Sequence, residues 1–345
     1  MGKLQRNSSI DAIKGIAIVL VMIGHVFVHN RMEDAYIYDF IKAVQMPLFM
    51  IISGYLCGQG RKISDLKTYG SILGKRAVSY LVPFFAWLTI MHPFNLVEAY
   101  QTIFVSLDYG LWFLAILFIL TFMVYTAQLA AGKLREKKFW MSEVVFWGVY
   151  GVLCLILVVQ IVLGNNFLSP YLTIIYVPFY MLGYVAGNYG KRFFSWGVKE
   201  PGKIDCKNNR LLQCFVALMA IGFLYLVVAK NLNSMETRMD VIVQMAASLL
   251  GSAAIIYGVF LWKEGKCKDF FAKIGLYTLE IYVLHYHFAD ILNFNNTQYD
   301  FYTVSGAVFV LLSFVAMCAI TFAAIWILKK IKRLDFLLFG KNRQR

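Results

Sequence analysis

The sequence predicts an all-α membrane protein, built as a bundle of about ten transmembrane helices. Of its 345 residues, 60% are hydrophobic and only 15% are charged. The mean hydropathy of +0.65 is too high for a soluble domain of this length. Repeated apolar runs also have the length needed to cross a hydrocarbon core of about 30 Å. A polytopic membrane protein explains all three observations.

The expected spans follow one another along the whole chain. The second and third contain Lys42, Pro47 and Pro83, and the sixth contains Pro178, which membrane helices tolerate when neighbouring groups satisfy the freed backbone. The longest segment between spans, residues 189–210, is too short for a folded domain, so one integral-membrane domain is expected over residues 1–345. The spans are predicted near residues 10–28, 40–57, 77–94, 110–131, 143–164, 171–188, 211–230, 241–262, 270–292 and 304–328.

Lysine and arginine residues between the spans predict the orientation. Nearly all of them fall in the two termini and in every second loop, whereas the opposite loops hold only Arg31, Lys230 and Arg238. By the positive-inside rule the basic segments are cytoplasmic. Both termini are therefore expected in the cytoplasm, and an even number of spans agrees with termini on the same side. The location that fits this pattern is a plasma or inner membrane.

The same distribution argues against two other classes of function. The net charge of +14 is dispersed over segments that flank the membrane and contains no nucleic-acid recognition motif. The six cysteines stand apart, without C-x-x-C or His/Cys ligand spacing, so neither a disulfide framework nor a metal site is predicted. We expect no nucleic-acid partner and no bound metal. The oligomeric state is left open.

The first span carries ionisable residues that need an explanation. Asp11, Lys14 and His25 lie within a single apolar run, and charged groups in a membrane helix are costly and usually functional. His25 is eleven positions after Lys14, close to three helical turns, so both side chains share one face about 16 Å apart. Asp11, three residues before Lys14, is expected to form a structural ion pair with it.

Five segments resemble the acyltransferase 3 family of integral-membrane acyltransferases in order and in position. The resemblance extends from the first span to the ninth. The chain is most similar to compact members of the family, which O-acetylate envelope polysaccharides and have no appended extracytoplasmic domain. The segments are RNSSIDAIKGIAIVLVMIGH, MPLFMIISGYL, KRAVSYLVPFFAW, LWFLAILF and YTLEIYVLH.

The resemblance implies transfer of an acyl group, usually acetyl, from cytoplasmic acetyl-CoA. The acceptor it implies is a hydroxyl of an extracytoplasmic glycan or of its lipid-linked precursor. The essential basic residue and histidine of the family's first span fall on Lys14 and His25. Many members have arginine at the first position, and lysine keeps the charge but loses the bidentate fork.

Depth in the membrane supports His25 as the general base. If residue 10 lies at the cytoplasmic boundary, His25 is about 22 Å deep, and in a ninth span beginning at Lys273, His285 is about 18 Å deep. A neutral imidazole there could take the proton of an acceptor hydroxyl. Glu280, about 10 Å deep by the same rise, and His285 are further catalytic candidates. For both, a structural role stays open.

Other residues are candidates for binding the two substrates. Lys75 and Arg76, at the cytoplasmic end of the third span, and Arg192, after the sixth, could hold the phosphates of coenzyme A. The positive-inside rule alone would also explain them. Tyr55 and Trp112 have amphipathic rings that can line a substrate path, and packed membrane helices use aromatic residues in the same way.

Two alternatives to an enzyme stay open at this point. A small-solute transporter would explain ten spans, broken helices and buried charges without any reaction. A scaffold for glycan assembly would explain the membrane helices but not the shared face of Lys14 and His25.

Overall fold

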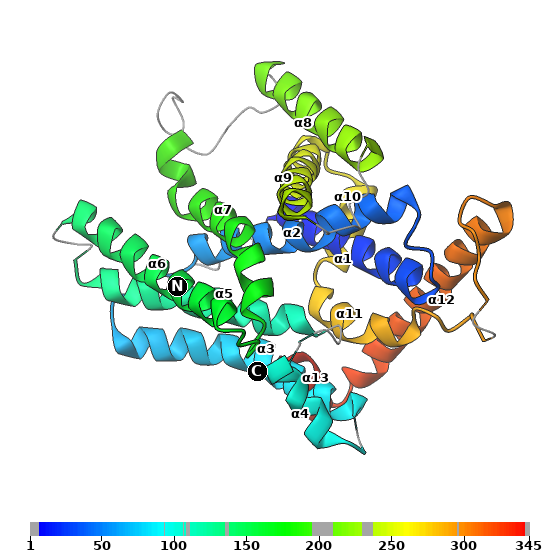
Figure 1. Cartoon of the computed structure of the whole chain (residues 1–345), viewed down its shortest axis with the longest axis horizontal. Helices are drawn as coiled ribbons and strands as arrows, with labels where there is room; N and C mark the ends of the chain where they lie inside the picture. The colour runs from blue at the N-terminus through cyan, green and yellow to red at the C-terminus, as the bar shows by residue number, and fades with distance from the viewer. Residues whose placement is uncertain are drawn as a thin grey trace. The chain divides into compact units, whose positions relative to one another are not determined.

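The computed structural model is helical throughout the part of the chain that it describes (Figure 1). That part comprises residues 7–92, 94–105, 107, 111–134, 138–194, 210–229, 237–294 and 297–341, without the side chains of 98, 99, 102, 191–194, 211, 212 and 238. No β-strand occurs in these ranges. The predicted all-α class is confirmed.

Seven of the described helices are long and apolar enough to cross a membrane. Their positions agree with seven of the expected spans, and the ten-span count and the cytoplasmic termini stay predictions. The seven are α1 (Ser8–His29), α2 (Tyr36–Gln59), α5 (Trp112–Gly132), α6 (Phe139–Val162), α7 (Pro170–Phe194), α9 (Arg238–Leu261) and α12 (Val304–Leu328).

The three other expected spans differ from a simple apolar helix. The third lies in α3 (Leu66–Met91), whose first half contains Lys67, Lys75 and Arg76. The seventh is α8 (Arg210–Ala229), with a short apolar stretch. Residues 270–292 do not form one helix but three short ones, α10 (Lys266–Ile274), α11 (Thr278–Leu284) and the 3-10 helix η1 (His285–Phe288). Two further short helices are α4 (Leu96–Val105) and α13 (Lys332–Phe339).

The chain divides into two compact units. The first unit comprises Met1–Ile52 and Tyr189–Trp326, and the second comprises Ser53–Asn188 and Ile327–Arg345. The division falls inside α2, α7 and α12. A single domain over residues 1–345 stays a prediction.

In the first unit, α1 packs against α10 with almost no space between the two backbones. A Cβ at Gly15 would overlap the carbonyl oxygen of Phe271, and one at Gly275 would overlap that of Asp11. Small residues permit such an approach in membrane helices, where close packing replaces the hydrophobic effect as the main source of association. The Asn7 side chain caps α1 by accepting hydrogen bonds from the backbone N–H groups of Ser9 and Ile10.

The other end of α1 is held by the segment that follows η1. The buried Asn30 side chain donates to the carbonyl oxygens of Val26, at 2.7 Å, and Ala289, at 3.2 Å. Its Oδ1 accepts a hydrogen bond from Asn293 Nδ2 at 3.1 Å. Because Asn30 directly follows α1 and Ala289 directly follows η1, these bonds fix η1 beside the last turn of α1.

In the second unit, glycines also bring α2 and α7 together. A Cβ at Gly54 would overlap the carbonyl oxygen of Tyr180, and one at Gly187 that of Tyr55. Hydroxyl and amide groups connect α7 to α5, with Thr121 Oγ1 3.0 Å from the Tyr180 hydroxyl and Gln128 Nε2 donating to the Tyr184 hydroxyl at 3.1 Å. These buried bonds satisfy polar groups that would be costly if left alone in an apolar interior.

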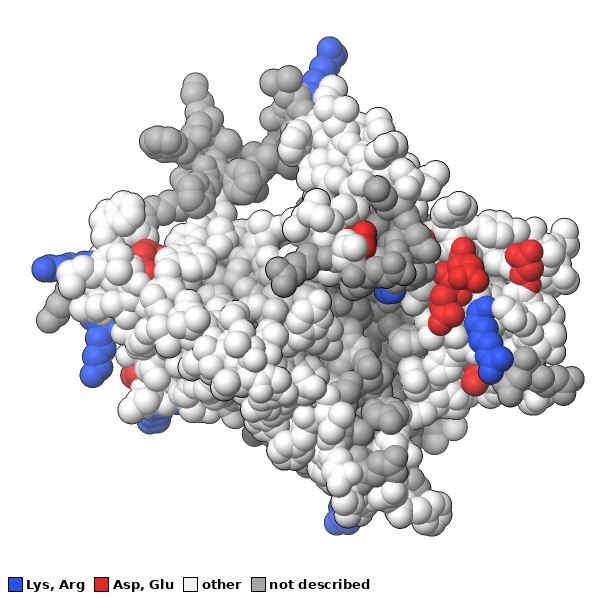
Figure 2. Space-filling view, viewed as in Figure 1, with Lys and Arg blue, Asp and Glu red and all other residues white. Residues whose placement is uncertain are grey.

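Much of the described surface is apolar, as expected for contact with lipid. In α6 the side chains of Val144, Leu155 and Val162 are exposed. Charged side chains are sparse on the face shown in Figure 2. The apolar residues that predicted a membrane protein therefore lie on the surface of the described helices as well as between them.

We expect Gly15→Ala to lower the free energy of unfolding by about 1–3 kcal/mol, because the added methyl group would force α1 away from α10. Gly148→Ala is the matched control, because a Cβ at this position in α6 meets no atom within 4 Å. Thermal unfolding of the two variants in detergent tests this. Equal midpoints would contradict the close approach.

Asn30→Ala should remove the donor to the buried Ala289 carbonyl, at a cost of about 1–3 kcal/mol. Asn166→Ala, whose side chain is exposed, should stay within about 0.5 kcal/mol of the wild type. Denaturant or thermal unfolding measures both. A loss no larger for Asn30→Ala than for Asn166→Ala would show that the bonds do not hold η1.

Candidate functional site

The ionisable residues of α1 lie on one continuous helix. Lys14 Nζ and Asp11 Oδ1 are 2.6 Å apart, with relative side-chain exposures of 21% and 9%. Because α1 runs unbroken from Ser8 to His29, the eleven steps from Lys14 to His25 place them about 16 Å apart along its axis. The ion pair therefore lies at the α10 end of α1, and His25 lies toward the η1 end.

At that end, the rings of four residues from α1 and η1 form a cluster. The His25 ring is 5.0 Å from the ring of His285 and 5.2 Å from that of Tyr286, between ring centroids. His29, one turn after His25, is 5.9 Å from His25 and 4.5 Å from Tyr286. Thus two histidines that are 260 positions apart in the sequence, His25 and His285, are brought into contact.

Hydrogen bonding defines the protonation of the His285 ring. Its Nδ1 is 2.8 Å from the carbonyl oxygen of Ile281, which can only accept a hydrogen bond, so Nδ1 carries a proton, and in the neutral ring Nε2 then has the lone pair. Nε2 is buried and has no hydrogen-bond partner among the described residues, and the same holds for His25 Nδ1. The cluster thus presents unoccupied ring nitrogens in an apolar environment.

Two acidic residues flank the histidine cluster in the chain. Glu280 lies in the first turn of α11 and is fully buried, where the helix dipole favours a negative charge. Asp290 follows η1, and its Oδ2 is 3.9 Å from His29 Nδ1. The predicted candidates Glu280 and His285 therefore belong to one short segment, α11–η1, that packs on α1.

In the second unit, Arg76 lines a small polar pocket. Its Nη1 donates to the Tyr80 hydroxyl at 3.3 Å. The pocket has a volume of about 80 Å³ and opens beside Cys57, Thr121 and Tyr125. Arginine with surrounding hydroxyl donors is suited to binding an anionic oxygen. The other residues lining the pocket are Ser53, Leu56, Leu117 and Tyr180.

The other predicted binding residues lie outside this pocket. Lys75 is exposed, although it directly precedes Arg76. The Tyr55 hydroxyl accepts a hydrogen bond from Gln59 Nε2 at 2.6 Å. Trp112 stacks on Tyr176 with the ring centroids 5.3 Å apart. The side chain of Arg192 lies outside the described part of the chain.

Several residues of the histidine cluster and of the Arg76 pocket were not predicted from the sequence. Tyr80 follows Arg76 by four residues on a helix, a spacing that could have indicated the contact. Tyr286 directly follows the predicted His285. Tyr125 and Tyr180 come from α5 and α7, and nothing in the sequence near Arg76 indicates them. In the described part of the chain, no three His, Cys, Asp or Glu side chains are arranged to hold a metal ion.

Two curated proteins are similar to part of the chain. One is the nodulation protein NolL of Sinorhizobium fredii, 32% identical over 102 residues, or 28% of this chain and 27% of that protein. The other is the nodulation protein NolL of Mesorhizobium japonicum, 35% identical over 96 residues, or 26% of this chain and 25% of that protein. The chain thus spans only about a quarter of the length of these relatives.

No solved structure matches the chain significantly. The family comparison covers far more of it, because the model of the acyltransferase 3 family, described as an acyltransferase domain, matches residues 7–329. This range includes the histidine cluster, the Arg76 pocket and all seven long apolar helices. The chain belongs to the acyltransferase 3 family and is a multi-pass membrane protein.

Proposed function

We propose that this protein is a membrane O-acyltransferase. It moves an acetyl group from cytoplasmic acetyl-CoA to a hydroxyl of an extracytoplasmic envelope glycan or lipid-linked sugar. The observation that carries the proposal is the contact between His25 and His285, 5.0 Å apart between ring centroids, in a chain of an acyltransferase family. The plasma or inner membrane, with both termini in the cytoplasm, is the location that fits this chemistry.

His25 is the general base of the proposed reaction. As the acceptor oxygen attacks the thioester carbonyl, the hydroxyl proton passes to His25, and it then passes to the departing coenzyme A thiolate, so no net proton is consumed. The buried Nδ1 of His25, without a partner among the described residues, supports this role. Histidine also needs little change in pKa to act near neutral pH.

His285 orients the base, and Glu280 supports the segment that holds it. The hydrogen bond from His285 Nδ1 to the Ile281 carbonyl keeps the ring in one tautomer beside His25. The buried Glu280 lies one turn before His285 in that segment. Lys14, held by Asp11, supplies the positive charge of the family's first-span pattern.

Arg76 is the residue we assign to the anionic part of the donor. Its pocket of about 80 Å³ admits one small charged group and not a whole nucleotide, so the rest of coenzyme A would lie outside it. Lys75 is exposed and away from the pocket lining. This geometry favours Arg76 over Lys75 as the contact to phosphate.

His25→Gln should lower acetyl transfer by about 10²–10⁴-fold, because it removes the base. His287→Gln, at an exposed histidine of the same segment, is the matched control and should keep the wild-type rate. Purified protein with labelled acetyl-CoA and cell-envelope glycan would measure label transfer and free-thiol release. Wild-type transfer by His25→Gln would exclude this base. Solute uptake without thiol release by the wild type would indicate a transporter.

Arg76→Gln should weaken the binding of coenzyme A by roughly 10–100-fold, the usual effect of losing a charged hydrogen bond. Arg76→Lys should recover only part of this loss, since it restores the charge without the fork. Lys138→Gln, at an exposed lysine of the same unit, is the control. Calorimetric titration of the purified proteins gives the three affinities. Unchanged affinity in Arg76→Gln would remove Arg76 from the donor site.

A further inference from the structure

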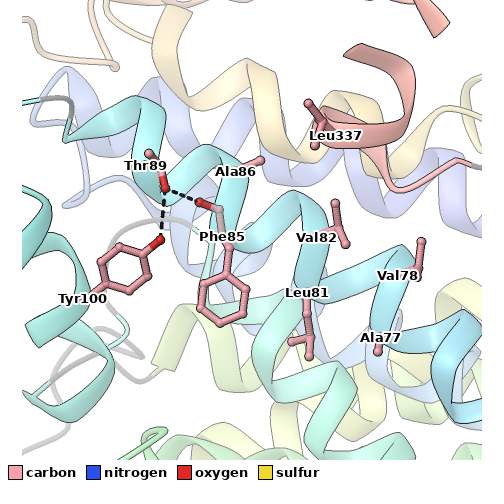
Figure 3. Close-up of a pocket in the computed structure, with 9 residues that line it drawn as sticks. All are labelled: Ala77, Val78, Leu81, Val82, Phe85, Ala86, Thr89, Tyr100 and Leu337. Atoms are coloured by element: carbon pink, nitrogen blue, oxygen red, sulfur yellow. Dashed lines mark hydrogen bonds between the residues drawn. The ribbon is translucent and has the colours of Figure 1, made fainter. Parts of the chain in front are cut away.

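One face of α3 forms an open apolar groove (Figure 3). The groove has a volume of about 450 Å³, and neither the histidine cluster nor the Arg76 pocket contributes to it. Its floor is a stripe of α3 residues at helical spacing, with Tyr100 of α4 and Leu337 of α13 at its sides. The α3 residues are Ala77, Val78, Leu81, Val82, Phe85, Ala86 and Thr89.

The two hydroxyl groups in the groove are already occupied. Thr89 Oγ1 donates to the Phe85 carbonyl oxygen at 2.8 Å and lies 3.2 Å from the Tyr100 hydroxyl. Tyr100 therefore donates its proton to Thr89. The Tyr100 ring also stacks on Phe85, with the centroids 6.2 Å apart. A sugar would find no free donor among these groups, whereas a hydrocarbon chain needs none.

The length of the groove matches one leaflet of a bilayer. From Ala77 to Thr89, twelve residues of helix extend about 18 Å. Half of a hydrocarbon core of about 30 Å is about 15 Å. A single acyl chain lying along α3 can therefore cover the groove from Ala77 to Thr89.

Positive charge lies before the open end of the groove. Lys67 and Lys75 of α3 are both exposed. Lys67 is eleven residues before Val78 and so shares its helical face. Between the two lysines the helix surface is uncovered, because a Cβ at Gly70 or Gly74 would meet no atom within 4 Å.

The neighbouring charged groups are engaged elsewhere. The Arg76 guanidinium donates to the Tyr80 hydroxyl in the polar pocket. The Asp65 carboxylate caps α3 by accepting the Thr68 backbone N–H at 2.7 Å. Lys67 and Lys75 are thus the cations placed to meet a headgroup.

We propose that this face of α3 is a specific site for an anionic phospholipid, whose phosphate lies between Lys67 and Lys75 and whose acyl chain fills the groove. Two observations carry the assignment: the positive charge of Lys67 and Lys75 before the groove, and an open apolar groove as long as one acyl chain. Basic residues beside membrane helices bind anionic headgroups in this way, each contributing about fivefold in affinity.

The test is a titration of the full-length purified protein with phosphatidylglycerol or phosphatidylcholine, followed by native mass spectrometry. We expect tighter retention of phosphatidylglycerol. Lys67→Gln and Lys75→Gln should each weaken it about fivefold, and Val82→Trp, which fills the groove, should abolish the specific site. Lys266→Gln and Leu155→Trp, both at exposed positions outside the groove, are the controls and should retain the lipid.

Equal retention of the two lipids, or retention unaffected by Val82→Trp, would overturn the site. A loss of dimers in Val82→Trp with unchanged lipid retention would also overturn it, because a second copy of the chain would then be the occupant. The measurement counts bound lipid and involves no acyl transfer. Its outcome is therefore independent of whether the proposed reaction is correct.

Discussion

The close approach of α1 to the segment from α10 to η1 is the constraint on which the histidine cluster depends. At one end, Gly15 and Gly275 let the two backbones pack without side chains between them. At the other end, Asn30 connects the last turn of α1 to Ala289. Because α1 is straight between these contacts, the position of His25 relative to His285 follows from both. In a membrane, such packing and hydrogen bonding replace the hydrophobic effect as the stabilising interactions.

The two units carry chemically different groups. The first unit holds neutral rings in an apolar environment, which suits proton transfer, because an unpaired charge there would be costly. The second holds a guanidinium among hydroxyl groups, which suits the binding of an anion. In the proposed reaction, the first set of groups would serve proton transfer and the second would hold an anionic group of the donor.

Helix α3 carries both charged and apolar stretches. Its basic residues make α3 less apolar than the other long helices. These residues lie in different surroundings, because Arg76 lines the polar pocket whereas Lys67 and Lys75 are exposed. The opposite requirement, contact with hydrocarbon, is met by the stripe from Ala77 to Phe85. A charged residue in a membrane helix is tolerated when a partner or the membrane interface satisfies it.

The sequence by itself determined the all-α class, seven of the apolar helices, the family and the shared face of Lys14 and His25, because helical periodicity and hydropathy are local properties. Tertiary structure decided the rest. The helix expected over residues 270–292 ends at Gly275, where the backbone of α1 packs against it. Arg76 lines a pocket with Tyr125 and Tyr180 from distant helices, whereas the neighbouring Lys75 does not. Such contacts depend on how helices cross and on which rotamers fit between them, and no local pattern contains that information.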